Sequence, residues 1–545
     1  MRPHPMGDKS NGIRYHVFFS AKKELKMEDT VASTQYDTQN PERQALTLFG
    51  KTGVMNVEWD PDAKVTPNGP LVYFAQFLHT GGLFNALCND APLHSTSRNI
   101  SHPRNVLGTL MLAILNGHLR FAHINTLRND KVAPHLMGMS KIVSEDSVRR
   151  AFSAERATYE ELDAWLTTHE NATLAPLLTE PHIIDLDSSV KPLYGHQEGA
   201  EIGYNPKKPG RPSHAIHTAF IASARLVLSV DIQPGKAHAG AHTMPVFWKR
   251  YDALPPEARP RLIRGDVSYG NEDILLQCEQ RNQPCLFKLA RHKNVTSAFR
   301  RLRDDADAWA DVGEGWQGRE TELKLMGWTR ARRCVFLRRP ASAPAPKPEP
   351  PKPGARQPEF EFVRDLKPDH GWEIVCLVTN DATLTPAELA PLYRQRADCE
   401  NVIDEIKNQW AWSGFMTRDL QRCRVLARLT ALVYNWWNIF TRLAQPDRHL
   451  EAVTSRPLLL NAVGRLVESG RRKLLWLSSN HALADKIQLV LGRIGQFLTR
   501  LHAAAEQLGR QNFWPWILRA AFRNFFKTTP PDCPQPMPLN LLAAT

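Results

Sequence analysis

The segment HIIDLD, residues 182–187, is the first of five short apolar runs that decide the fold. The other four are HTAFIAS (217–223), LVLSVDI (226–232), RLIRGD (261–266) and PCLFKLA (284–290). Segments of helical character lie near Met244–Ala253 and Glu272–Gln280. Three strands followed by a helix, a strand, a helix and a strand predict an α/β unit whose sheet is covered on both sides.

Acidic residues in this unit mark a candidate site. Asp185 and Asp187 alternate with Leu186, so both carboxylates are expected on one face of a buried strand. Asp266 ends another apolar run, where it serves a site, caps the following helix, or does both. A carboxylate at the end of a buried strand is costly to desolvate without compensation. Ligand sites in open α/β sheets form at that edge.

A second cluster lies in LYRQRADCENVIDEIK, residues 392–407, on a helix expected to begin at Pro386. Tyr393, Arg396, Glu400 and Lys407 fall at about 0°, 300°, 340° and 320° around such a helix and share one stripe. The alternative is an exposed amphipathic helix in which Arg396 and Glu400 form an i,i+4 pair. Asp404, about 20° from the stripe, is a further candidate carboxylate.

The chemistry of these residues favours magnesium. Two strand aspartates and a helix glutamate would supply three oxygen ligands, which suits Mg²⁺. Two such ions about 4 Å apart can promote cleavage of a phosphodiester. The sequence contains no Cys/His cluster that would select a softer metal. The sequence therefore indicates magnesium-dependent phosphodiester chemistry.

These residues resemble the DDE transposases of bacterial insertion sequences, in the subgroup with the Y-(2)-R-(3)-E-(6)-K signature. DLDSSVKPLYGHQEGAEIGYNPKKPGRPSH (185–214) and LIRGDVSYGNE (262–272) resemble the first- and second-aspartate segments of the insertion-sequence family numbered 1380, within the superfamily numbered 4. The resemblance extends from about residue 75 to 440. It implies an α/β ribonuclease-H-like catalytic core with a β-rich insertion, and cut-and-paste transposition.

The resemblance also implies roles for particular residues. Asp187, Asp266 and Glu400 become the metal-binding triad for two Mg²⁺ ions, for which Mn²⁺ can substitute. Asp187 is preferred to Asp185 because Ser188 and Ser189 follow it, as small hydroxyl residues do in the family. The expected DNA-binding residues are Tyr393, Arg396, Lys407, His196, Lys207, Lys208, Arg211 and Trp372.

One departure from the family concerns an aromatic residue that stacks on a flipped base. Val375 stands at the aligned position. Trp372 or Trp328 could substitute by stacking. Whether the flanking DNA is released through a DNA hairpin therefore stays open.

The expected organisation has flanking regions that are all-α. The expected parts are a polar, partly disordered leader (1–70), a helical DNA-end-binding domain (71–178), the ribonuclease-H-like core (179–291 and 383–415), an insertion with a proline-rich loop (292–382), a basic helical C-terminal domain (416–530) and a tail (531–545).

Charge favours a polyanionic partner. The net charge is +13, and residues 411–529 hold 18 Lys and Arg against 6 Asp and Glu. Double-stranded DNA, both element ends and target, is the expected partner, and the resemblance implies a homodimer on DNA. The eight cysteines form no CxxC pair, and no apolar run is long enough for a membrane span. A cytoplasmic, nucleoid-associated bacterial protein is expected.

The predicted function is a DNA transposase that cleaves insertion-sequence ends and transfers their 3′-hydroxyls into target DNA. Two alternatives stay open. One is a catalytically retired DNA-binding protein of transposase descent, and the other is a nuclease that cuts without joining.

Overall fold

The computed structural model describes residues 46–51, 53–94, 101–205, 208–341, 369, 371–412, 414–415, 417–480, 482–504, 509 and 513–524. Lys207, residues 342–358 of the expected proline-rich loop, the expected tail and most of the expected leader lie outside this range. The chain forms two compact units, residues 1–63 and 64–545. In the first, β1 (Leu46–Gly50) and β2 (Gly53–Val57) form an antiparallel hairpin.

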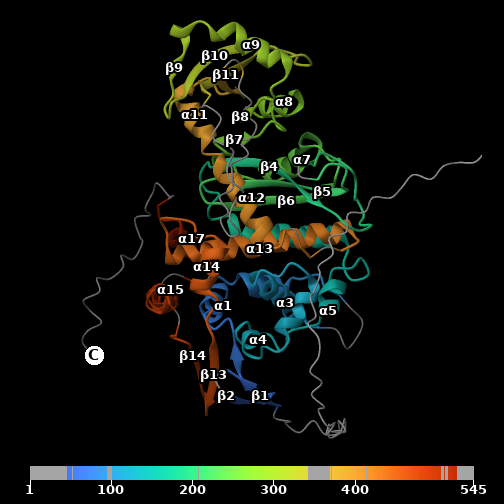
Figure 1. Cartoon of the computed structure of the whole chain (residues 1–545), viewed down its shortest axis with the longest axis vertical. Coiled ribbons are helices and arrows are strands. Elements are labelled where there is room, and N and C mark those ends of the chain that lie inside the picture. Colours follow the sequence, from blue (N-terminus) through green and yellow to red (C-terminus); the bar gives the residue numbers. More distant parts are fainter. Residues whose placement is uncertain are drawn as a thin grey trace, which may run out of the picture. The chain divides into compact units, whose positions relative to one another are not determined.

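A nine-stranded mixed sheet is the centre of the second unit (Figure 1), in the order β6-β5-β4-β7-β8-β12-β11-β10-β9. The five apolar runs are its strands β4 (Ile183–Pro192), β5 (Ser213–Ile221), β6 (Leu226–Pro234), β7 (Leu262–Gly265) and β8 (Cys285–Lys288). The expected strands and their order along the chain are thus confirmed. Strands β4, β5 and β6 are antiparallel neighbours, whereas β4, β7 and β8 run parallel.

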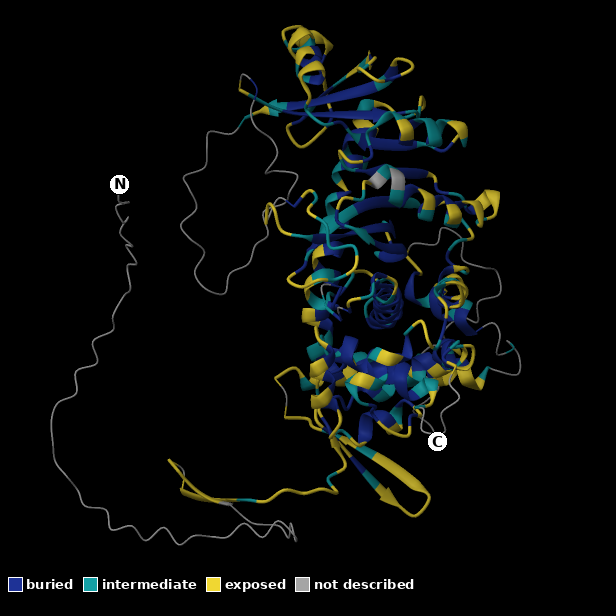
Figure 2. Cartoon of the chain, turned by 90° about the vertical axis from the view of Figure 1, so that its right-hand side faces the viewer, coloured by how far each residue is buried: buried dark blue, intermediate teal, exposed yellow. Residues whose placement is uncertain are grey.

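Helices cover this part of the sheet. All nine residues of β5 are buried, which requires cover on both faces. Helix α7 (Ala239–Asp252) packs on β5 and β6, α12 (Ala397–Gln409) on β4, and α13 (Leu420–Ala444) on β6. Figure 2 shows buried residues running along the strands and the helices packed against them.

The chain between β8 and the glutamate helix extends the same sheet. Strand β12 (Trp372–Thr379) pairs antiparallel with β8, and β11 (Arg332–Pro340), β10 (Gln317–Leu323) and β9 (Ala310–Asp311) follow. The guanidinium of Arg338 lies between two indoles, 4.1 Å from the ring centre of Trp309 and 4.3 Å from that of Trp372. Stacking of arginine on tryptophan therefore joins these strands to the preceding loop.

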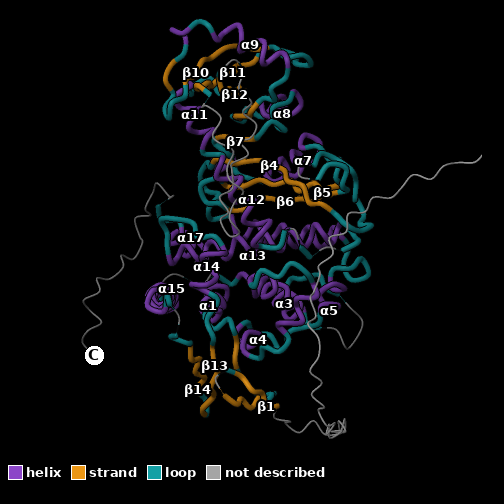
Figure 3. The backbone as a smooth tube through the Cα atoms, viewed as in Figure 1, coloured by secondary structure: helices purple, strands orange, loops and turns teal. Residues whose placement is uncertain are grey.

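Helix α13 is buried along almost its whole length. It packs against β6 and also against α1 (Leu71–Thr80), α3 (Pro103–Leu115) and α6 (Tyr159–Leu174). Figures 1 and 3 show it lying between the sheet and the N-terminal helices. Protein thus covers α13 on several sides, so its buried polar side chains need partners within the fold.

The remaining helices belong to the two flanks and the sheet connections. They are α2 (Leu83–Asn89), η1 (Phe121–Leu127), α4 (Val132–Leu136), α5 (Glu145–Ala151), η2 (Pro256–Ala258), α8 (Glu272–Gln280), α9 (Lys293–Arg303), η3 (Ala306–Ala308), α11 (Pro386–Arg394), α14 (Ala452–Leu459), α15 (Ala484–Ala503) and α17 (Phe513–Ala521).

The expectation of a purely helical C-terminal region is wrong. Strands β13 (Gly464–Ser469) and β14 (Arg472–Leu477) form a hairpin that also pairs with β3 (Val65–Thr66). Gly470 has a φ of 58° and begins the two-residue connection between the strands. A glycine with positive φ at this position favours a tight hairpin turn.

Part of the C-terminal charge excess faces inward. Arg428 is 8% exposed and donates from Nη1 to Asp163 at 2.6 Å and from Nε to Glu170 at 2.8 Å. Arg424 pairs with Asp231 of β6 at 3.3 Å, and the 2% exposed Arg442 donates to the carbonyl oxygen of Ala224. These cations join α13 to α6 and to the sheet.

The cysteines that the structure describes are buried free thiols. They are Cys88, Cys278, Cys285, Cys334, Cys376, Cys399 and Cys423.

In the part of the chain that the structure describes, no helix combines the length and apolar character needed to traverse a bilayer.

Replacing Arg428 by Met should lower the free energy of unfolding by about 3 kcal/mol, because Asp163 and Glu170 lose a buried positive partner. Urea unfolding measures the change. The control Arg493→Met alters an exposed arginine of α15 and should stay within about 0.5 kcal/mol of the parent protein. Equal effects of the two substitutions would contradict the internal role of Arg428.

Candidate active site

Asp187 and Asp266 are the residues that directly follow the paired parts of the adjacent parallel strands β4 and β7. Asp187 belongs to β4 and is 9% exposed. Asp266 directly follows β7, is half-buried, and accepts a hydrogen bond from the backbone N–H of Ser268 at 2.9 Å. Asp266 does not cap the next helix, because Asn271 caps α8 by accepting from the N–H of Ile274. Asp266 instead shapes a short turn.

The prediction of one continuous helix carrying Tyr393, Arg396, Glu400 and Lys407 is wrong. The segment is divided into α11, which carries Tyr393, and α12, which carries Glu400 and Lys407 and has Arg396 at its N-cap. At the junction, the N–H of Arg396 donates to the carbonyl of Tyr393, three residues earlier, instead of four. Such a tightened turn brings side chains at i and i+3 into line. Tyr393 and Arg396 therefore stay on one side despite the break.

Arg396 links the strand carboxylate to the helix carboxylate. Its side chain is 4% exposed, with Nη2 3.4 Å from Asp187 Oδ1 and Nη1 3.5 Å from Glu400 Oε1. Nη2 also donates to the carbonyl oxygen of Leu186 at 3.4 Å. Its Nε is buried and has no hydrogen-bond partner among the described residues. The guanidinium of Arg396 thus contacts both β4 and α12, and its Nε remains available as a donor.

The neighbouring carboxylates affect the ionisation of Asp187. Burial raises the pKa of Asp187 to about 7, against the opposing influence of Arg396, and the nearby charges of Asp266 and Glu400 add to the rise. Burial is also the main cause that raises the pKa of Tyr393, whose surroundings include the same three carboxylates. Three like charges in a poorly solvated place favour a divalent cation.

The donor set fits magnesium in its chemistry, because all three groups are carboxylates. Among the described residues, however, no group of three or more His, Cys, Asp or Glu side chains is close enough to form a ready-made metal site. Asp187 and Glu400 both contact the guanidinium of Arg396 in this structure.

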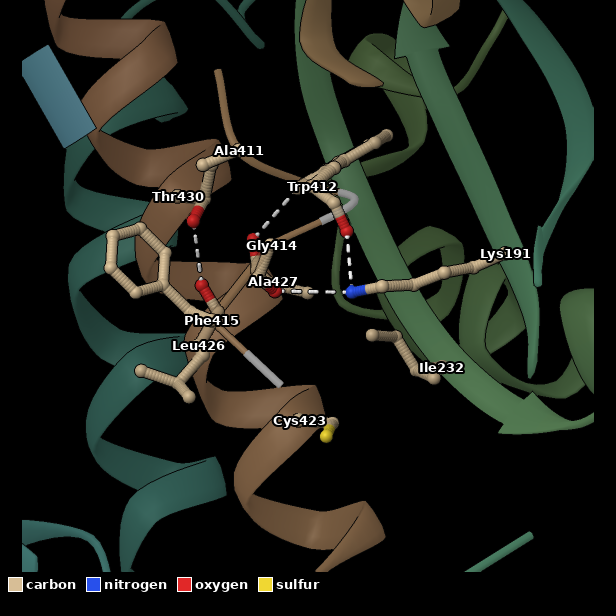
Figure 4. A pocket seen from close by; sticks show the side chains of 10 residues that line it. All are labelled: Lys191, Ile232, Ala411, Trp412, Gly414, Phe415, Cys423, Leu426, Ala427 and Thr430. Atoms are coloured by element: carbon tan, nitrogen blue, oxygen red, sulfur yellow. Dashed lines mark hydrogen bonds between the residues drawn. The ribbon is translucent and has the colours of Figure 1, made fainter. Parts of the chain in front are cut away.

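Lys407 contacts strand β4. Its Nζ donates to Ser189 Oγ at 2.8 Å and to the carbonyl oxygen of Val190 at 3.4 Å. Lys191 makes a similar link further along, with Nζ donating to the carbonyls of Trp412 and Gly414 at 2.9 and 3.1 Å (Figure 4). Burial lowers the pKa of Lys191 to about 8.

The contacts of Ser189 and Lys191 were not predicted, although strand alternation contained the signal. Both lie at even spacing from Asp187, and residues at even spacing share one face of a strand. The two lysine contacts hold α12 and the chain after it against the strand that carries Asp187.

The expected basic DNA-binding loop also contains an exposed aromatic residue, Tyr194, which was not predicted to bind DNA. His196, Lys208 and Arg211 are exposed, as is Tyr194, at 69%. Lys208 Nζ and Arg211 Cζ lie 5.0 and 4.7 Å from the Tyr194 ring centre, and Lys208 also donates to the Tyr194 hydroxyl. An exposed ring flanked by two cations suits a nucleic-acid backbone.

The candidate base-stacking residues are covered. Trp372 is half-buried, with Arg338 on its ring, and Trp328 has the Arg332 guanidinium 5.0 Å from its ring centre. Val375 is 1% exposed inside β12. The structure therefore presents neither tryptophan as an open stacking surface.

Comparison with known proteins gives one family match. Residues 55–499 match the family model described as "Transposase DDE domain group 1". No curated protein sequence is significantly similar to the chain. Among solved structures, one described as "Cryo-EM structure of piggyBac transposase synaptic complex with hairpin DNA (SNHP)" is similar at 9% identity and a TM-score of 0.37, covering 85% of this chain and 87% of that chain. A TM-score this low does not establish a shared fold.

The raised pKa of Asp187 predicts how stability depends on pH without metal. Between its ordinary pKa of 3.8 and about 7, the folded protein keeps a proton that the unfolded chain has lost. The Asp187 contribution is therefore present below pH 4 and lost as pH rises to about 7. Thermal unfolding in chelator should show a smaller fall over this range for Asp187→Asn than for the parent. Parallel curves would mean that Asp187 ionises normally.

Proposed function

This chain belongs to the DDE transposases of domain group 1, and we propose that it cleaves the ends of an insertion sequence and joins their 3′-hydroxyls to target DNA in a metal-dependent reaction. The observation that carries the proposal is the link through Arg396 between Asp187 and Glu400. It brings a carboxylate of the sheet and one of the helix together, and Asp266 lies near enough for its charge to raise the pKa of Asp187.

The proposed catalytic core is ribonuclease-H-like. Its support is the strand arrangement, in which β6, β5 and β4 form an antiparallel meander and β7 and β8 follow parallel to β4. The resemblance of the signature residues to the insertion-sequence family numbered 1380 supports membership of that subgroup. The strands β9–β12 and the chain between them would then be the insertion.

Asp187, Asp266 and Glu400 would hold two Mg²⁺ ions, or Mn²⁺ in their place. When bound, the metal supplies charge neutralisation and Lewis-acid polarisation of the phosphate that is cut. The chain positions these carboxylates from β4, from the residue after β7 and from α12, and it surrounds Asp187 with protein. The poorly solvated surroundings strengthen every charge interaction at the site.

Arg396 would exchange partners during the reaction. Without metal, its charge balances Asp187 and Glu400. Its buried Nε lacks a partner among the residues described, and a guanidinium suits phosphate oxygens. With metal present, Arg396 is proposed to bind a terminal phosphate. Lys407 and Tyr393 would support the same phosphate, Lys407 after leaving Ser189.

DNA would also contact the basic loop through His196, Lys208 and Arg211, with Lys207 beside them in the sequence. Trp372 could join the DNA contacts only by giving up its stacking on Arg338. We further propose that the protein acts as a homodimer on DNA.

Asp187→Asn, Asp266→Asn and Glu400→Gln should each reduce cleavage of end-bearing DNA roughly 10³-fold or more, because each removes a metal ligand. Binding of the same DNA without metal should stay within a few-fold of the parent. The matched control is Asp404→Asn, which alters an exposed carboxylate on the same helix and should stay within about twofold.

The same assay separates the alternatives. Cutting without joined products would identify a nuclease, and end binding without cutting by the parent protein would identify a retired binder. Undiminished cutting by Glu400→Gln would refute the site assignment.

The double variant Lys208→Ala/Arg211→Ala should weaken binding to end-bearing DNA. The negative slope of log affinity against log salt concentration should become shallower by up to about 2, since each phosphate contact contributes about 0.9. Fluorescence anisotropy at several salt concentrations measures the slope. The control Arg330→Ala removes an exposed arginine already paired with Glu279 at 2.8 Å, and it should leave the slope unchanged. An unchanged slope in the double variant would exclude this loop as a phosphate contact.

A further inference from the structure

Two buried charged residues outside the proposed metal-binding set join the segments that carry it. Asp185 of β4 is 1% exposed and Arg264 of β7 is 2% exposed, and they are in register across the two parallel strands. Arg264 Nε and Nη2 donate to Asp185 Oδ1 and Oδ2 at 2.6 and 2.7 Å. The third nitrogen, Nη1, donates to the carbonyl oxygen of Leu392 in α11.

Each of these contacts is next to a residue of the proposed site. Asp187 lies two residues after Asp185, and Asp266 lies two residues after Arg264. Leu392 immediately precedes Tyr393, at the end of the helix that leads into Arg396. The guanidinium of Arg264 on β7 therefore contacts β4, which carries Asp187, and the end of α11, which leads into α12 and Glu400.

The chemistry of the guanidinium makes this contact directional. It is planar, always charged and holds a carboxylate with two parallel bonds, so it fixes orientation as well as distance. A buried ion pair of this kind adds little net stability, since well-packed apolar residues can often replace it without loss. Groups that orient metal ligands nevertheless change metal affinity or activity 10- to 100-fold.

We propose that Asp185 and Arg264 form a positioning pair, which sets the spacing of β4, β7 and α11 so that Asp187, Asp266 and Glu400 can bind metal together. The inference rests on the proposed function. It assigns Asp185 to Arg264, with both carboxylate oxygens engaged, and leaves Asp187 as the metal ligand of β4. Neither member of the pair touches DNA or metal.

The test uses the full chain and the double variant Asp185→Leu/Arg264→Met, which removes both charges together. Thermal unfolding is followed against Mn²⁺ concentration, alongside cleavage of end-bearing DNA. The double variant should unfold within about 3 °C of the parent in chelator. Its half-saturating Mn²⁺ concentration should rise about tenfold or more, and its cutting should fall 10- to 100-fold. End-DNA binding without metal should be unchanged.

Two further variants separate positioning from stability. Arg264→Lys keeps the charge but loses the bidentate contact with the carboxylate. It should therefore also raise the half-saturating Mn²⁺ concentration. This variant tests the inference if the double variant does not fold. Arg428→Met should unfold earlier with an unchanged Mn²⁺ dependence. Parent-like Mn²⁺ dependence and cutting in both folded site variants would overturn the inference alone. A parent protein that neither responds to Mn²⁺ nor cuts DNA would overturn the proposed function and the inference together.

Discussion

The burial of α13 is the constraint on which the rest of the second unit depends. The helix fills the space between β6 and the N-terminal helices, and its polar side chains are used internally. Asn435 accepts from the N–H of Val227 at 2.9 Å and donates to the carbonyl of Val227 at 2.8 Å, which satisfies a backbone position on the edge strand β6. These hydrogen bonds occupy backbone groups of the kind that an edge strand otherwise leaves open to another chain.

At the site, the governing problem is the accumulation of negative charge beside a sheet. Asp185, Asp187, Asp266 and Glu400 come from three segments, and water is largely excluded from the first two. Two arginines divide the compensation: Arg264 forms an ion pair with Asp185, and Arg396 is shared between Asp187 and Glu400. The longer contacts of Arg396, near 3.5 Å, mark it as the more replaceable partner.

Much of the core could be predicted from sequence because its signals are local. Short apolar runs identified β4 to β8, and fixed spacing identified Glu400 and its neighbours. The division between α11 and α12 was missed, because helical residues on both sides hide a tightened turn. The strands β13 and β14 were missed although Gly470 marked the turn. Partners such as Arg264 with Asp185 could not be predicted, because strand register is a property of the folded sheet.

The packing of α13 has a consequence for how such proteins could diversify. If residues 71–178 recognise the element's ends, they do not form a detachable module, because α6 is joined to α13 through Arg428 and α1 and α3 lie against the same helix. A graft of that region alone from a relative would leave Arg428 and the aromatic side chains of α13 facing an unmatched surface. New end specificity would therefore arise more readily through point changes at exposed positions than through exchange of the whole of residues 71–178, unless α13 were exchanged together with them.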